Sequence, residues 1–118
     1  MLGVSYRQNI GDTRYSPVEP LVKALEVEGA DVVIFDPYVS YWREMDRSLP
    51  SKIPNAKNFS AIVMAIPHRE FLELNLVDWL DTARPIVIDA ANITSRVDRD
   101  HCRLRGIRIE SIGRGDGL

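Results

Sequence analysis

The sequence predicts an α/β domain with a mainly parallel sheet of about five strands. Two observations lead to this fold class. Short apolar runs alternate along the chain with segments of helical spacing, which is the pattern of repeated strand–helix–strand units. Several runs are apolar without interruption, as in strands that a parallel sheet buries on both faces. The expected strands are residues 1–5, 31–35, 61–65, 86–89 and 107–112.

The helix that follows the first strand has the clearest end signals. Ser16 fits its N-cap, Pro17 its first position and Glu19 the partner in a capping box. Gly29 is expected to end it, because glycine adopts the left-handed conformation that closes helices. The strand of residues 31–35 comes next, and the crossover between the two strands should be right-handed.

Residues 39–58 are the least regular stretch and are expected to be mostly loop. Tyr41, Trp42 and Met45 suggest a short amphipathic turn or helix, and Ile53 suggests a short strand. Three helical segments are predicted later in the chain, and a glycine-rich end is expected to fray. They are residues 69–74, 75–82 and 95–104, the last capped by Ser95 and ended by Gly106, and the frayed end is 113–118.

Composition favours one ordinary globular domain. The 118 residues are 45% hydrophobic and 27% charged, with a formal net charge of −2, so no global charge points to nucleic acid or a membrane surface. The longest apolar run, residues 61–67, is too short to span a bilayer, and no secretory signal is visible. The single Cys102 excludes an internal disulfide, and no Cys/His spacing suggests a zinc site. We therefore expect a cytoplasmic protein without a structural metal.

The polar loop between the first strand and the first helix is the main candidate site. Arg7 and Arg14 lie close to Asp12 and beside a helix N-terminus, where exposed N–H groups and guanidinium groups together attract anions. The alternative is that Asp12 pairs with Arg14 and only fixes the loop. The two interpretations are compatible if Asp12 positions Arg14, and spacing does not choose between them.

Other polar residues follow the later apolar runs. Asp36 is best explained as a strand-end turn, because no Gly-x-Gly-x-x-Gly follows the first strand to make a dinucleotide site. His68 could contact a ligand or donate a proton, but a lone histidine is more often a capping or surface residue. Asp89 and Asn92 either line a cleft at the carboxyl ends of the strands or make turn hydrogen bonds.

Nothing in the chain forms a catalytic set. Cys102 has no base beside it and is expected to be buried or inert. Tyr38, Tyr41 and Trp42 could stack on a base, but packing against the sheet is the default. No nucleophile elbow or phosphate-loop motif is present.

The segment Gly3-Val4-Ser5-Tyr6-Arg7-Gln8-Asn9-Ile10-Gly11-Asp12-Thr13-Arg14-Tyr15-Ser16-Pro17 resembles a family motif. It is similar to Gly-Leu-x-[Phe/Tyr]-Lys-x-x-x-x-Asp-x-Arg-x-Ser-Pro, which opens the C-terminal, nucleotide-binding domain of the UDP-glucose/GDP-mannose dehydrogenases. The resemblance continues in the right order over residues 29–38, at 61–65 with His68, and at 86–92. It covers nearly the whole chain.

The resemblance implies a three-layer α/β/α Rossmann-like domain, residues 1–118, that is a piece of a longer dehydrogenase. Such enzymes use NAD to oxidise the C6 alcohol of a UDP-sugar or GDP-mannose to a carboxylate through a cysteine thiohemiacetal, in polysaccharide biosynthesis. The NAD-binding domain and that cysteine are absent here, and Cys102 matches no catalytic position, so the chain alone should be inactive. We also expect the full-length form to be a homodimer.

On this resemblance the residues that contact the substrate nucleotide are Tyr6, Arg7, Asp12, Arg14 and Asn92. Two positions depart from the family pattern: Arg7 replaces a lysine, and Ala91 stands where Asp-Gly-Arg-Asn has its arginine. Losing that arginine removes a charge-assisted contact, so binding is weaker or another basic residue substitutes. The alternatives are a non-catalytic binding or oligomerisation module with a degenerate nucleotide site, and an unrelated small enzyme that shares the fold.

Overall fold

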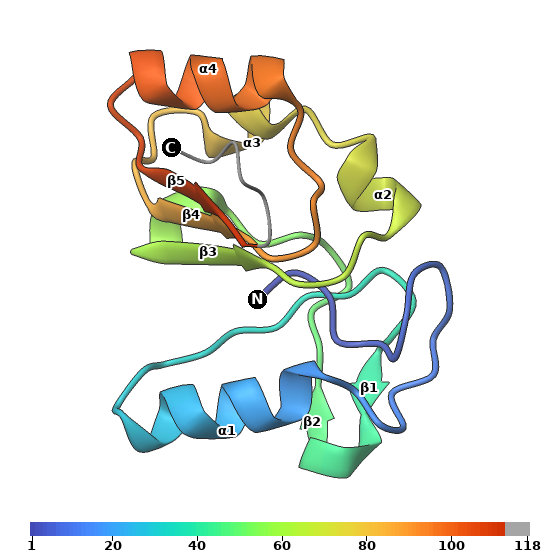
Figure 1. Cartoon of the computed structure of the whole chain (residues 1–118). Helices are drawn as coiled ribbons and strands as arrows, with labels where there is room; N and C mark the ends of the chain where they lie inside the picture. The colour runs from blue at the N-terminus through green and yellow to red at the C-terminus, as the bar shows by residue number, and fades with distance from the viewer. Residues whose placement is uncertain (113–118) are drawn as a thin grey trace.

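The computed structural model describes residues 1–112, and its centre is a parallel sheet (Figure 1). Three regular strands form it in the order β3 (Ala61–Met64), β4 (Ile86–Asp89) and β5 (Ile109–Ser111). All three run parallel, as predicted.

The two expected strands that come first in the chain extend this sheet through isolated bridges. Leu2 bridges both Met64 and Phe35 in parallel. The backbone N–H of Leu2 donates to the carbonyl of Val63 at 2.7 Å, and that of Gly3 donates to Phe35 at 2.8 Å. The strand order is therefore second, first, third, fourth and fifth, which confirms the parallel α/β class, although only three of the five segments are regular strands.

Helices cover the two faces of the sheet. The helices are α1 (Val18–Val27), α2 (Arg69–Leu72), α3 (Leu76–Leu80) and α4 (Arg96–Leu104), and two 3-10 turns are η1 (Arg43–Met45) and η2 (Ala56–Asn58). In Figure 1, α3 and α4 lie above the sheet and α1 lies below it. Two separate clusters of buried apolar side chains fill these layers. One includes Met64, Leu76, Leu80, Val87 and Cys102, and the other includes Val4, Val18, Val22, Ile34 and Trp42.

The predicted helix signals hold at three of four places. Ser95 caps α4 in a full capping box with Asp98, and Gly106 follows the C-cap of this helix with φ +73°. Gly29 follows α1 with φ +93°, as a C-terminal stop requires. The start of α1 is a correction: Pro17 occupies the cap position, and no capping box with Glu19 forms. Ser16 still accepts a hydrogen bond from the Val18 N–H at 3.1 Å, because its side chain reaches over the proline that has no N–H to offer.

The turn or helix suggested by Tyr41, Trp42 and Met45 is confirmed only at Met45, which lies in η1, and the prediction of a strand at Ile53 is wrong. Tyr41 and Trp42 instead form a strand of an antiparallel hairpin, β1 (Tyr41–Trp42) with β2 (Arg47–Ser48). Its burial alternates, with Tyr41 exposed and Trp42 fully buried, which is the period of a strand. No strand forms at Ile53.

The strand of residues 31–35 is also less buried than predicted. Val33 remains 38% exposed, because among residues 1–112 this segment pairs with the first strand only and so lies at the edge of the sheet. The expected fray of residues 113–118 lies outside the described residues.

Candidate functional site

The loop that follows the first strand, residues 5–16, is called the first loop here. Gly3 turns the chain out of the strand with φ +100°, and a Cβ there would lie 2.6 Å from the Cβ of Ile66, so only glycine fits. The loop closes on itself where the Tyr6 N–H donates to the Asp12 carbonyl at 2.6 Å. Tyr6 is 51% exposed, and the two residues after it are also exposed. The hydrogen bond between Tyr6 and Asp12 therefore closes the first loop, and the residues just after the strand are exposed to solvent.

Asp12 and Arg14 form a two-pronged ion pair on this loop. Arg14 Nε lies 3.0 Å from Asp12 Oδ1, and Nη2 lies 2.7 Å from Oδ2. The backbone N–H of Arg14 also donates to the same carboxylate. The side-chain and backbone hydrogen bonds from Arg14 lower the pKa of Asp12 to about 2. The pair fixes the loop and neutralises Arg14, as the structural interpretation predicted.

Arg7 contrasts with Arg14. It is exposed, and within residues 1–112 its guanidinium has no ion-pair partner. Its backbone is nevertheless held, because the Ser5 hydroxyl donates to the Arg7 carbonyl at 2.9 Å. The loop therefore offers one uncompensated positive charge on a fixed backbone position.

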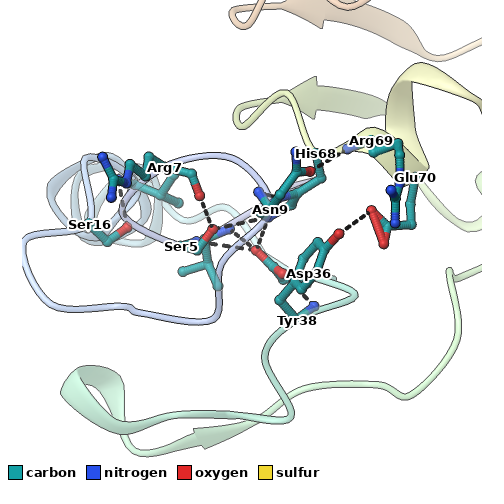
Figure 2. A network of polar contacts seen from close by, with 11 residues as sticks. Ser5, Arg7, Asn9, Ser16, Asp36, Tyr38, His68, Arg69 and Glu70 are labelled. Atoms are coloured by element: carbon teal, nitrogen blue, oxygen red, sulfur yellow. Dashed lines mark hydrogen bonds and ion pairs between the residues drawn. The ribbon is translucent and has the colours of Figure 1, made fainter.

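A buried polar cluster of Ser5, Asp36 and His68 lies directly behind the first loop (Figure 2). All three side chains are at most 2% exposed. His68 Nε2 lies 2.8 Å from Asp36 Oδ2 and 3.0 Å from Ser5 Oγ. On the other side of the ring, the Asn9 backbone N–H donates to His68 Nδ1 at 2.9 Å. The cluster joins three strand ends and the loop.

The hydrogen bonds fix the tautomer of His68. A backbone N–H can only donate, so Nδ1 must be the unprotonated acceptor and the ring proton must be on Nε2. Nε2–H then donates toward Asp36 and Ser5, while the Ser5 hydroxyl donates to Arg7. A Ser-His-Asp triad needs the serine and the aspartate on opposite ring nitrogens. Here both use Nε2, so Ser5 is not an activated nucleophile and the cluster is a structural clamp.

Asp36 is the acceptor at the centre of the clamp. It receives the N–H groups of Val4 at 2.8 Å, Ser5 at 3.2 Å and Tyr38 at 2.8 Å. Burial opposes the ionisation of Asp36, but the hydrogen bonds from His68 and these backbone groups outweigh it and hold its pKa below the ordinary value. The Tyr38 contact is the predicted strand-end turn.

The sequence suggested that His68 is a capping or surface residue without a visible partner. It does occupy the N-cap position of α2, but its side chain makes no cap hydrogen bond, and the surface position is wrong because the ring is fully buried and hydrogen-bonded. The hydrogen-bond partners of His68 could have been predicted from the order of the strands in the sheet. Asp36 and His68 each follow a strand that flanks the first strand, so their side chains converge on Ser5 at one edge.

Asp89 and Asn92 belong to the loop after β4. The Asp89 carboxylate is fully buried and accepts the N–H of Ile93 at 3.0 Å, the N–H of Thr94 at 2.8 Å and its hydroxyl at 2.6 Å. Despite its burial, these bonds hold the pKa of Asp89 below the ordinary value. Asn92 is exposed and adopts φ +58°. Asp89 thus makes the turn hydrogen bonds that shape the loop carrying Asn92.

The register brings the two loops to the same edge of the sheet. Leu2 pairs with Met64, and Met64 pairs with Asp89. Neighbouring strands lie about 4.8 Å apart, so the chain leaves the sheet at Leu2 and at Asp89 about 10 Å apart. The first loop and the loop that carries Asn92 therefore begin at the same edge of the sheet.

The remaining candidates carry no chemistry. Cys102 is fully buried, which raises the pKa of its thiol, as expected for an inert cysteine. Among the described residues, no three His, Cys, Asp or Glu side chains gather as a metal site would need. Within the same part of the chain, none of the helices has the length and apolar character to cross a membrane.

Comparison with known proteins shows which family the chain belongs to. Residues 1–96 match the UDP-binding domain of the UDP-glucose/GDP-mannose dehydrogenase family. The chain belongs to this family. It is similar to a UDP-N-acetyl-D-mannosamine dehydrogenase of Methanocaldococcus jannaschii, with 29% identity over 98% of the chain and 26% of the relative. It is also similar to a UDP-glucose 6-dehydrogenase of Rickettsia conorii, with 30% identity over 96% of the chain and 27% of the relative.

Solved structures of family members agree with this fold. An NDP-N-acetyl-D-galactosaminuronic acid dehydrogenase of Methanosarcina mazei superposes with a TM-score of 0.81 at 26% identity, over 97% of this chain and 24% of that one. A UDP-D-ManNAc dehydrogenase of Pyrococcus horikoshii gives 0.72 at 30% identity, over 98% of this chain and 25% of that one. The UDP-binding domain therefore spans about a quarter of these relatives and matches them as their C-terminal part.

Proposed function

We propose that this chain binds the nucleotide of a UDP-sugar at the first loop. In this proposal residues 1–118 are the single nucleotide-sugar-binding domain of an NAD-dependent dehydrogenase that oxidises the C6 alcohol to a carboxylate. The NAD site and the catalytic cysteine belong to the remaining part of that enzyme, so the chain alone turns over no substrate. We further propose that the full-length enzyme is a homodimer. It would act in the cytoplasm, in polysaccharide biosynthesis.

The observation that carries the proposal is the unpaired charge of Arg7. A diphosphate needs a cation that is not already neutralised, and the Arg14 charge is taken up by Asp12. The guanidinium of Arg7 would contact the diphosphate, and Tyr6 beside it would contact the nucleotide or the sugar. Asp12 and Arg14 would shape the loop, and Asn92 would approach the nucleotide from the loop after β4.

Ala91 limits the expected affinity. No charged side chain is available at this position to hold the nucleotide from the second loop. Removal of one charge-assisted hydrogen bond weakens binding by about 1.5–3 kcal/mol, so Arg7 should carry a larger share of the binding free energy than a single cation usually does.

Calorimetric titration of UDP-glucose, UDP and GDP into wild type, Arg7→Ala and Arg14→Ala tests the proposal. Arg7→Ala should weaken binding of the uridine ligands about tenfold or more, because it removes the free cation. Arg14→Ala is the matched control and should weaken binding less, because Arg14 is engaged by Asp12.

Equal effects of the two variants would contradict the assignment of Arg7. Absence of UDP binding by a folded chain at millimolar ligand would favour the alternative of a binding or oligomerisation module with a degenerate site.

A further inference from the structure

We infer that His68 is a positioning residue: its unprotonated Nδ1 holds the first loop in the nucleotide-binding conformation, and protonation of that nitrogen releases it. The inference rests on the proposed function for its ligand and on the clamp geometry for its mechanism. It concerns a residue that touches no nucleotide itself, because its side chain is completely buried.

One imidazole ring anchors the first loop on both sides of its exposed segment. Through Nε2 it contacts Ser5 at 3.0 Å, and Ser5 in turn holds the Arg7 carbonyl. Through Nδ1 it accepts the Asn9 N–H at 2.9 Å. Tyr6, Arg7 and the residue after them lie between these two anchor points and are exposed, so their own burial cannot fix them.

Asn9 makes the second anchor specific. Its backbone has φ +63°, the left-handed conformation that asparagine adopts more readily than most other non-glycine residues. Its side-chain Oδ1 accepts the Arg69 N–H at 2.8 Å, so both of its contacts end at the start of α2 (Figure 2). Loss of the Nδ1 contact leaves Asn9 held to α2 by a single exposed hydrogen bond, the one from Arg69.

Protonation reverses the role of Nδ1. An imidazolium carries a proton on both nitrogens, so Nδ1–H and the Asn9 N–H would be two donors facing each other. Asp36 still accepts from Nε2–H in that state, and the ring stays in place while the loop loses its anchor. Besides Asp36, the ionisable groups near the ring are Tyr38, whose ring centroid lies 4.8 Å from that of His68 and whose hydroxyl donates to Glu70 at 2.7 Å, and the charged residues Arg69 and Glu70.

The sign of the resulting pH dependence distinguishes this mechanism from simple charge attraction. A new positive charge behind Arg7 would by itself strengthen binding of a diphosphate. Release of the loop weakens binding instead. Protonation of Nδ1 on acidification from about pH 8 to about pH 5 should therefore lower nucleotide affinity.

The test is the affinity for UDP-glucose across this range. Both phosphates of this ligand are esterified, so its charge stays constant. Wild type should lose about tenfold in affinity on acidification, the effect of one hydrogen bond. The chain supplies a control in its other histidine: His101→Gln, at an exposed position of α4, should titrate like wild type.

Two substitutions separate the ring nitrogens. Gln at position 68 places an amide donor near Nε2 and no acceptor near Nδ1, whereas Asn places an amide oxygen near Nδ1. His68→Gln should bind weakly at every pH, at the level of acidified wild type. His68→Asn should recover part of the affinity and show no pH dependence. Equal behaviour of the two variants, or affinity that rises on acidification, would overturn the inference.

Nitrogen-15 NMR of the ligand-free wild-type chain tests the loop anchor independently of nucleotide binding. The spectrum should show a proton on Nε2 only, and the Asn9 amide should be protected from hydrogen exchange until the ring is protonated. An unprotected Asn9 amide at neutral pH would overturn the inference. If no nucleotide binds at any pH while the amide is protected, the proposed function fails and the loop anchor stands.

Discussion

Asp89 shows how one buried carboxylate shapes a loop of the site. It accepts hydrogen bonds from the backbone of residues 91, 93 and 94 and from the Thr94 hydroxyl. The sheet register then places the exposed Asn92 toward the same edge as the first loop. The loop conformation therefore depends on an ionised Asp89.

Asp89→Asn should lower the free energy of unfolding by about 1–3 kcal/mol at neutral pH, because an amide cannot accept all of these donors. The pKa of Asp89 is depressed, so its stabilisation is present above the unfolded-state value of about 3.9 and is lost as the pH falls through the folded value. Urea unfolding at pH 7 and at pH 3 measures this, and the difference between variant and wild type should shrink at pH 3. Asp100→Asn, an exposed control on α4, should change little. Equal stability of Asp89→Asn and wild type at pH 7 would contradict this role.

At the scale of elements, α4 depends on its cap. Ser95 Oγ accepts the Asp98 N–H at 3.1 Å, and the Asp98 carboxylate accepts the Ser95 N–H at 3.1 Å. Ser95→Ala should cost about 1 kcal/mol, because it leaves N-terminal N–H groups without an acceptor. Thermal unfolding should show a lower midpoint than for Ser51→Ala, an exposed serine outside the helices. The same midpoint for both variants would show that the cap does not stabilise the domain.

Elements with strong local signals were predictable. The apolar runs of β3 and β4 and the caps at Ser95 and Gly29 are readable because propensity and burial agree there. The hairpin of β1 and β2 was not, because its strands are two residues long and their alternation is too short to recognise. Trp42 is buried in the same apolar cluster as Val18 and Val22 of α1, and burial among residues far apart in the chain is not visible in a local pattern.

The candidate site was predictable only in outline. Parallel strands end at one edge, so the first loop and the loop of Asn92 could be expected there. Pairing of Asp12 with Arg14 was one of two open alternatives, and only geometry separates it from a free anion site. The clamp of Ser5, Asp36 and His68 needed the strand order, which brings together residues up to 63 positions apart.

At the scale of the whole molecule, the UDP-binding domain is a folded unit whose sheet edge carries two loops, and among the described residues the exposed Arg7 on the first loop has no ion-pair partner. It spans about a quarter of the dehydrogenases that it resembles. Nucleotide binding is therefore the property that can be tested directly on this chain, and the central claim is that the nucleotide binds at the first loop.

NMR mapping of UDP-glucose on the 118-residue chain measures that claim most directly. The amide shifts of residues 5–16 should move on titration, with smaller changes at residues 90–94 and none along α4. Shift changes confined to α4 or to the hairpin of β1 and β2, with the first loop unaffected, would contradict a nucleotide site at the first loop.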